Sequence, residues 1–139
     1  MTVNEYRRKA YYSSKYRNKK TECNFGHIHD SKSEAIRCGM LHQLQTIGRI
    51  SELRTQVKYI LIPTQREPSR EYYKKGKHKG ETKPGKVIEH ECAYYADFDY
   101  IRNGEHIVED VKGIKTEAYK IKKKLMLERH GIHLTEVQL

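Results

Sequence analysis

The sequence predicts a single α/β domain, and three patterns predict it. Apolar residues recur at helical spacing over 32–47 and again between Thr116 and Gly131. Between these helices, β-branched and aromatic residues gather in short runs, two of which flank Asn103-Gly104, a strong hairpin signal. The predicted order is helix, strand, hairpin, helix, strand, and 139 residues suit one such domain.

Both predicted helices have recognisable ends. Ser31 is a favoured N-cap and Glu34 stands three residues later, which makes a capping box, while Gly48 suits the position after the last turn. The apolar stripe of this helix comprises Ala35, Ile36, Cys38, Leu41, Leu44 and Ile47. The second helix is expected to begin after Thr116 and to end at Gly131.

Several segments have strand patterns. TQVKYILIP (55–63) ends at a proline, KVIEHECAYYADFDYI (86–101) leads into the hairpin turn, and GEHIVEDVKG (104–113) returns from it. IHLTEVQL (132–139) predicts a final strand, and TECNFGHIH (21–29) a short strand or hairpin.

Two basic segments lack an apolar pattern. Residues 64–86 form a polar loop marked by glycine and proline, and a long loop inside a compact domain is usually functional or disordered. Both interpretations stay open. Residues 1–20 have the composition of a flexible basic arm, which leaves 21–139 as the domain.

The composition favours a polyanionic partner. Lysine and arginine number 28 against 18 aspartates and glutamates, so the formal net charge is +10. Nucleic acid is the commonest polyanion, although a soluble basic protein with no such partner has the same charge. No apolar run reaches the length of a membrane span and no signal-peptide pattern opens the chain. We therefore expect a cytoplasmic protein with no membrane partner.

The three cysteines are Cys23, Cys38 and Cys92. Their odd number and irregular spacing argue against a disulfide framework. Cys23, His27 and His29 have the spacing of a metal knuckle, but a structural zinc site needs four ligands, and only Cys38 or His42 stands nearby. We expect small buried cysteines in a reducing compartment in preference to a zinc site.

The hairpin brings acidic residues together. With the Asn-Gly dipeptide as a two-residue turn, Asp97 faces Asp110 in a non-hydrogen-bonded pair, with Cα atoms about 4.5 Å apart. Lys112 projects from the same face as Asp110, whereas Glu109 points the other way. Two carboxylates this close cannot both ionise cheaply unless a positive group joins them.

A divalent cation such as Mg²⁺ would satisfy this requirement, because Mg²⁺ is held by one or two carboxylates, waters and substrate phosphates. Cation, lysine and paired carboxylates together suit phosphodiester hydrolysis. A solvated acidic face is the alternative, and a bulge near Tyr95 or Asp99 would spoil the pairing. Asp99 itself is expected to be exposed.

These residues resemble the PD-(D/E)XK pattern of the restriction-endonuclease-like superfamily. Asp97 and then Asp110-Val111-Lys112 match it, with Ala96 where proline is common. The segments KSEA, GRISELRTQVKYILIP, YADFDY and EDVKGIKT resemble a phage-encoded family of small PD-(D/E)XK nuclease-like proteins, over about 17–138. The resemblance implies an αβββαβ core with a mixed central sheet flanked by helices, and Holliday junction resolvase-like activity.

The resemblance also implies roles for single residues. Asp97 and Asp110 would hold Mg²⁺ or Mn²⁺, and Lys112 would be the catalytic lysine. Glu34 would match the acidic residue that many members carry on the first helix, either as a third catalytic and metal-binding carboxylate or only as part of the helix cap.

Basic and polar side chains around this site are candidate DNA contacts, each with a plain solvated residue as the alternative. They are Gln56, Lys74, Lys75, Lys77, Lys115, Lys120 and Lys124. Tyr72 and Tyr73 in the loop would stack on unpaired bases.

The sequence therefore predicts a metal-dependent DNA endonuclease, encoded by a phage or prophage and acting in the host cytoplasm. Its substrate would be branched or recombination-intermediate DNA, and a homodimer would supply the two sites needed to cut both strands. The alternative is a catalytically silent protein that binds or assembles nucleic acid through its basic segments.

Overall fold

The computed structural model describes residues 18–139, so most of the predicted arm, 1–20, lies outside the described residues. Ten elements follow in order. They are β1 (Thr21–Glu22), β2 (Ile28–His29), α2 (Lys32–Thr46), β3 (Ser51–Ile62), β4 (Gln65–Arg66), β5 (Val87–Glu89), β6 (Cys92–Arg102), β7 (Glu105–Val111), α3 (Glu117–His130) and β8 (Thr135–Val137).

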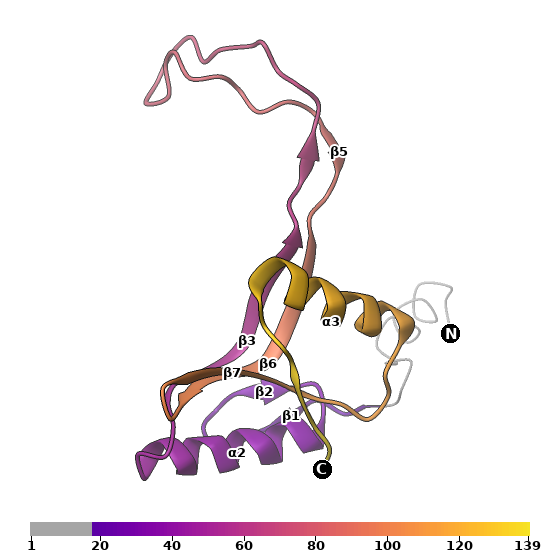
Figure 1. Ribbon diagram of the computed structural model, residues 1–139. Helices are drawn as coiled ribbons and strands as arrows, with labels where there is room; N and C mark the ends of the chain where they lie inside the picture. The colour runs from indigo at the N-terminus through magenta and orange to yellow at the C-terminus, as the bar shows by residue number, and fades with distance from the viewer. Residues whose placement is uncertain (1–17) are drawn as a thin grey trace, which may run out of the picture.

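The central sheet has four strands in the order β3-β6-β7-β8. The pairs β3–β6 and β6–β7 are antiparallel, and β7–β8 is parallel. Helices α2 and α3 lie on opposite faces of this sheet (Figure 1). The predicted α/β class, with a mixed central sheet flanked by helices, is confirmed at this level.

Both helices begin at the predicted caps. The Ser31 hydroxyl accepts the Glu34 N–H at 3.2 Å, and the Thr116 hydroxyl accepts the Tyr119 N–H at 3.2 Å. Gly131 ends α3 in the left-handed region, with φ at 65°. Local capping chemistry therefore fixes where each helix meets the sheet.

Each face of the sheet has its own apolar cluster. One joins Ala35, Cys38 and Leu41 of α2 to Phe98 and Tyr100 of β6. The other joins Tyr119 and Met126 of α3 to Leu61, Tyr94, Ala96, Val108 and Leu134. Ile36 and Ile47, which we expected in the stripe of the first helix, are 45% and 68% exposed and contribute little to these clusters.

The hairpin register is as predicted near the turn but not at the two aspartates. Arg102 pairs with Glu105, and regular pairing of β6 with β7 continues only as far as Phe98 and Glu109. Asp97 and Asp110 are therefore not ladder partners, which corrects the prediction. The carboxylate of Asp97 instead accepts the Val111 N–H at 2.8 Å.

The cause is a local irregularity at Asp97. Residues two apart on a regular strand share a face, yet Ala96 packs beneath α3 and Phe98 beneath α2. On the neighbouring strand, Gln56 lies opposite this point and has a φ of 52°, which is rare for a residue with a side chain. The irregularity turns the Asp97 carboxylate towards the backbone of β7.

Segment 64–86, which the sequence predicts as a loop, has backbone pairing. Strands β4 and β5 pair, and a further bridge joins Tyr72 to Thr82, so the segment is a two-stranded arm that leaves the sheet (Figure 1). A Cβ on Gly85 would lie 1.8 Å from the Glu67 carbonyl oxygen, so close approach of the two chains requires glycine there. We refer to 64–86 as the basic arm.

Candidate active site

Two buried aspartates stand where the β6–β7 pairing ends. Asp97 is 9% exposed and Asp110 only 1%. Besides Val111, the Asp97 carboxylate receives a weak bond from the Gln56 amide at 3.4 Å. One oxygen of Asp110 accepts the Tyr94 hydroxyl at 2.6 Å. Each carboxylate is thus held in place by polar partners that leave lone pairs free.

The electrostatics of Asp97 are unusual. Burial, followed by the nearby charge of Asp110, raises the pKa of Asp97 from 3.8 to about 7, although the Val111 N–H acts in the opposite direction. Glu34 adds to the raising effect and Lys112 lowers it. The predicted crowding of negative charge is therefore present, although the two aspartates are not paired in the ladder.

Lys112 is the positively charged side chain of this site. Its Nζ lies 2.7 Å from Oδ2 of Asp110 and 4.7 Å from the centre of the Tyr119 ring. The side chain of Lys112 is 26% exposed, so it is the member of the Asp97, Asp110 and Lys112 group with the most contact with solvent. It lies between the buried carboxylates and an open hollow.

This hollow has a volume of about 410 Å³. Glu34 lines it from α2, Lys112 and Gly113 from the end of β7, and Thr116 and Tyr119 from α3. The two aspartates do not line it and lie behind Lys112 and Val111. A substrate phosphate in the hollow would therefore meet Lys112 first.

Glu34 is placed for both of the roles that the sequence left open, the helix cap and a third carboxylate of the site. Its carboxylate accepts the Ser31 hydroxyl at 3.0 Å and the Asp30 N–H at 3.3 Å, so it completes the cap of α2. Burial raises its pKa, and Lys112 acts on it in the lowering direction. Glu34 therefore caps the helix and faces the hollow, while its role as a metal ligand stays a prediction.

Two further acidic residues of the hairpin, Asp99 and Glu109, lie outside the group of Asp97, Asp110 and Lys112. Asp99 is only 2% exposed, which corrects the expectation that it would be exposed. It binds Arg54 at 2.8 Å, His106 at 2.9 Å and the Tyr59 hydroxyl. Burial would raise the pKa of Asp99, but these partners outweigh it and lower the pKa. Glu109 faces away from the site, as predicted.

Glu109 has a structural role on the α2 face. Arg37 of α2 binds it through two nitrogens, at 2.9 and 2.6 Å, and the Tyr100 hydroxyl donates to it as well. Glu109 is 2% exposed, so Arg37 neutralises a buried charge and ties α2 to β7.

Three side chains of the site were missed by sequence reasoning. They are Tyr94, Tyr119 and Glu136. Glu136 pairs with Asp110 across the parallel strands, and Lys115 and Lys123 lower its pKa to about 2. Only the β7–β8 register reveals this position, and no local signal in the sequence gives the register of a parallel pair.

The predicted DNA contacts in α3 and in the segment just before it gather beside the site. Lys115, Lys120 and Lys124 line a second hollow of about 420 Å³, which shares Tyr119 with the first. Lys115 pairs with Glu136, and Lys120 with Glu117 at 2.7 Å, so two of these charges are partly neutralised. Lys122 instead donates to the Ala93 carbonyl at 2.8 Å.

The remaining predicted contacts are spread over the sheet and the basic arm. Gln56 is exposed and lies against Asp97, whereas Lys74, Lys75 and Lys77 are exposed near the end of the arm. The arm holds eight lysines and arginines against three glutamates, which gives it half of the formal net charge of +10. It is the most basic surface among the described residues outside α3.

The donor set at Asp97 and Asp110 fits a hard divalent cation. Both side chains are carboxylates, which suit Mg²⁺ or Mn²⁺, and burial together with the charge of Asp110 raises the pKa of Asp97. A bound cation would let both carboxylates ionise.

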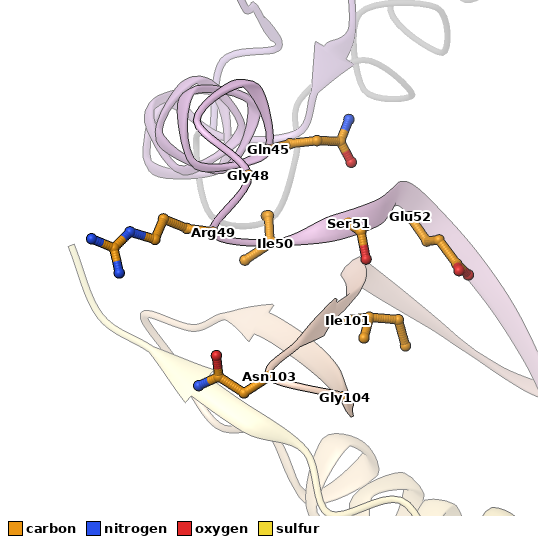
Figure 2. A pocket seen from close by; sticks show the side chains of 9 residues that line it. All are labelled: Gln45, Gly48, Arg49, Ile50, Ser51, Glu52, Ile101, Asn103 and Gly104. Carbon is orange, nitrogen blue, oxygen red and sulfur yellow. The ribbon is translucent and has the colours of Figure 1, made fainter.

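A third hollow, of about 560 Å³, lies at the tip of the hairpin and lacks this chemistry. Figure 2 shows its lining, in which Arg49 and Glu52 point away from one another. Ile50, Ile101 and the Asn103-Gly104 turn complete it. It offers no paired carboxylates and no lysine.

The comparisons with known proteins give a family and no function. A family model described as "Protein of unknown function (DUF1064)" matches residues 13–138. No curated protein and no solved structure matches the chain. No helix among residues 18–139 is long and apolar enough to cross a membrane.

Proposed function

The chain belongs to the DUF1064 family, whose function is unknown, and we propose that it is a metal-dependent DNA endonuclease of the restriction-endonuclease-like fold. One observation carries the proposal: Asp97 has a pKa raised to about 7 by burial and by Asp110, and Lys112 stands beside Asp110. The element order α2, β3, β6, β7, α3, β8 supports the αβββαβ core that the sequence resemblance implies.

Asp97 and Asp110 would hold Mg²⁺ or Mn²⁺, with Glu34 as a third carboxylate at the edge of the hollow. When bound, the cation supplies a water of lowered pKa and neutralises charge on the scissile phosphate. Lys112 orients the attacking water or stabilises the extra negative charge of the transition state, since it lines the hollow and its ammonium lies beside Asp110. Tyr94 fixes the orientation of Asp110 through its hydroxyl.

DNA would be bound by the lysines of α3 and of the basic arm through its phosphates. We place the substrate among branched DNAs, such as recombination intermediates of a phage or prophage, because the arm combines positive charge with the exposed aromatic Tyr72. Two copies of the chain would supply the two sites needed to cut both strands.

The test is cleavage of labelled linear, nicked and four-way DNA with Mg²⁺, Mn²⁺ or EDTA. We expect metal-dependent cleavage that falls at least about a hundredfold in Asp110→Asn and Lys112→Ala. Asp99→Asn is the matched control, because Asp99 is an equally buried aspartate on the same strand as Asp97 but outside the site. It should keep cation-dependent cleavage.

The same experiment separates the second candidate function. A DNA-binding or assembly protein would bind these DNAs through its basic arm and cleave none of them. Binding with no cleavage under any metal, or cleavage unaffected by Asp110→Asn, would contradict the endonuclease proposal.

A further inference from the structure

A second group of metal-binding side chains lies away from the aspartates, where the β1–β2 hairpin meets α2. Cys23, His27 and His29 come from the hairpin, and Cys38 comes from the helix. The ligand atoms of these four residues all lie within 4.8 Å of one another. We propose that they form a structural zinc site, with two thiolates and two imidazoles around one Zn²⁺.

The distances fit a tetrahedron. The sulfur atoms of Cys23 and Cys38 are 3.5 Å apart, and Nδ1 of His27 is 3.5 Å from the Cys38 sulfur. Zinc bonds of about 2.3 Å to sulfur and about 2.0 Å to nitrogen place ligand atoms about 3.3 to 3.8 Å apart. The two separations at Cys38 are thus already those that a bound ion would impose, and the remaining ligand atoms lie within 4.8 Å of one another.

His29 supplies an independent observation. It is 1% exposed, yet both of its ring nitrogens lack a hydrogen-bond partner. A buried imidazole with no partner for its N–H or its lone pair is costly and rare, so it needs an explanation. A zinc ion among these four residues would use one nitrogen as a ligand.

The local backbone supports the same site. Cys23 and His27 close a tight turn, in which the Cys23 N–H donates to the His27 carbonyl at 2.9 Å and the Gly26 N–H to the Cys23 carbonyl at 3.0 Å. This turn aims a sulfur and an imidazole at α2.

Charge balance is compatible with a buried zinc ion. Two thiolates, two neutral imidazoles and Zn²⁺ sum to zero, which suits a buried site. Soft sulfur and nitrogen donors in fourfold coordination select zinc and not Mg²⁺, so this site is chemically distinct from the carboxylate pair. The inference stands whether or not the chain is a nuclease.

The role follows from the elements that the ion would join. Strands β1 and β2 have two residues each, and a hairpin of this size is unstable alone. Zinc would fasten it to α2, whose first turn carries Glu34 at the edge of the active-site hollow. His29 also lies against Phe98 of the sheet, with ring centres 5.9 Å apart, so the ion would order one whole face of the domain.

The test is the zinc content of the full chain, purified under reducing conditions without chelator and measured by mass spectrometry of the metal. We expect one zinc per chain in the wild type and in Cys92→Ser, the control at the cysteine outside the cluster. Cys38→Ser and His29→Phe should retain at least about tenfold less zinc. Titration with Co²⁺ should give the visible absorption of a tetrahedral site with sulfur ligands.

Two further variants keep the test decisive if these proteins fold poorly. Cys38→His preserves four ligands and should still bind zinc, whereas Cys38→Ser should not. If packing alone holds the cluster together, the two variants should behave alike. His42→Ala removes a neighbouring imidazole outside the proposed set and should keep zinc. Three results would overturn the proposal. They are a wild type without zinc after growth with the metal, a Cys23–Cys38 disulfide in protein purified under reducing conditions, and zinc loss in His42→Ala alone.

Discussion

At the scale of single residues, the chemistry of the site depends on how burial acts on carboxylates. Asp97 and Asp99 are two residues apart and both buried, yet their pKa values move in opposite directions. Asp99 has Arg54, His106 and Tyr59 as partners, whereas Asp97 has one backbone N–H and a neighbouring negative charge. The lack of a cationic partner at Asp97, and not its position in the strand, is the reason why we propose it as a functional residue.

The raised pKa of Asp97 makes stability depend on pH. Between 3.8 and about 7, the folded chain holds a proton on Asp97 that the unfolded chain has released. This contribution is fully present below that range and is lost as the pH rises towards 7. Metal-free wild type should therefore lose about 2 to 4 kcal/mol more unfolding free energy than Asp97→Asn between about pH 4 and pH 8.

Urea unfolding at several pH values measures this difference directly. Groups that do not interact with Asp97 titrate alike in both proteins and cancel in the comparison. Parallel pH profiles for the wild type and Asp97→Asn would show that the pKa of Asp97 is not raised.

At the scale of elements, Arg37 decides how α2 packs on the sheet. Removing its guanidinium in Arg37→Ala leaves Glu109 charged, buried and bonded only to Tyr100. We expect a loss of about 3 kcal/mol of unfolding free energy. Chemical denaturation measures it.

Arg54→Ala is the matched control, because Arg54 also binds a buried carboxylate. Its side chain is 61% exposed, and Asp99 would keep Tyr59 and His106 as partners. We expect a loss of no more than about 1 kcal/mol. Equal losses in the two variants would contradict the role given to Arg37.

We expect the basic arm to contribute to DNA binding beyond the effect of net charge alone. Lys75 and Lys77 are exposed near its end, so Lys75→Gln/Lys77→Gln should weaken DNA binding and reduce the slope of log affinity against log salt by up to about 2. The control is Arg49→Gln/Arg102→Gln, which removes the same charge from the hairpin tip.

Binding isotherms at several salt concentrations compare the two double variants. The control should leave affinity and salt slope close to those of the wild type. Equal effects of both would mean that net charge alone, and not the arm, governs binding.

Local signals explain why some elements could be predicted and others could not. Ser31 and Thr116 cap their helices as expected, and the Asn103-Gly104 turn sets the register up to Phe98 and Glu109. The break at Asp97 lies opposite Gln56, a residue 41 positions away on another strand that has an unusual positive φ. Contacts between distant segments override local patterns at such points.

The same limit applies to the arm and to the cysteines. Backbone pairing within 64–86 needs no apolar pattern, so its sequence resembled a loop. Cys38 stands 15 residues from Cys23, and only the packing of α2 against the β1–β2 hairpin brings their sulfurs to 3.5 Å. Spacing alone therefore left Cys38 and His42 as alternatives for a fourth position, and the fold groups Cys38 with Cys23, His27 and His29.

At the scale of the whole molecule, the two faces of the sheet carry different tasks. The α2 face holds the buried ion pair of Glu109 with Arg37 and the cysteine and histidine group for which we propose zinc. The α3 face holds Tyr94, Tyr119 and the lysines around the second hollow, and the basic arm extends from the same sheet (Figure 1). Asp97 and Asp110 lie where the β6–β7 pairing ends, on the side away from the Asn103-Gly104 turn. A phosphate in the adjoining hollow could approach Lys112 there.

The central claim is that Asp97 and Asp110 hold a divalent cation, and direct titration with Mn²⁺ tests it. Electron paramagnetic resonance reports free Mn²⁺ as it is added to the wild type, Asp97→Asn, Asp110→Asn and Asp99→Asn at about pH 8, above the raised pKa of Asp97. The account predicts a Mn²⁺ site in the wild type and Asp99→Asn that is lost in Asp97→Asn and Asp110→Asn. Equal binding by the wild type and Asp110→Asn, or none by the wild type, would contradict it.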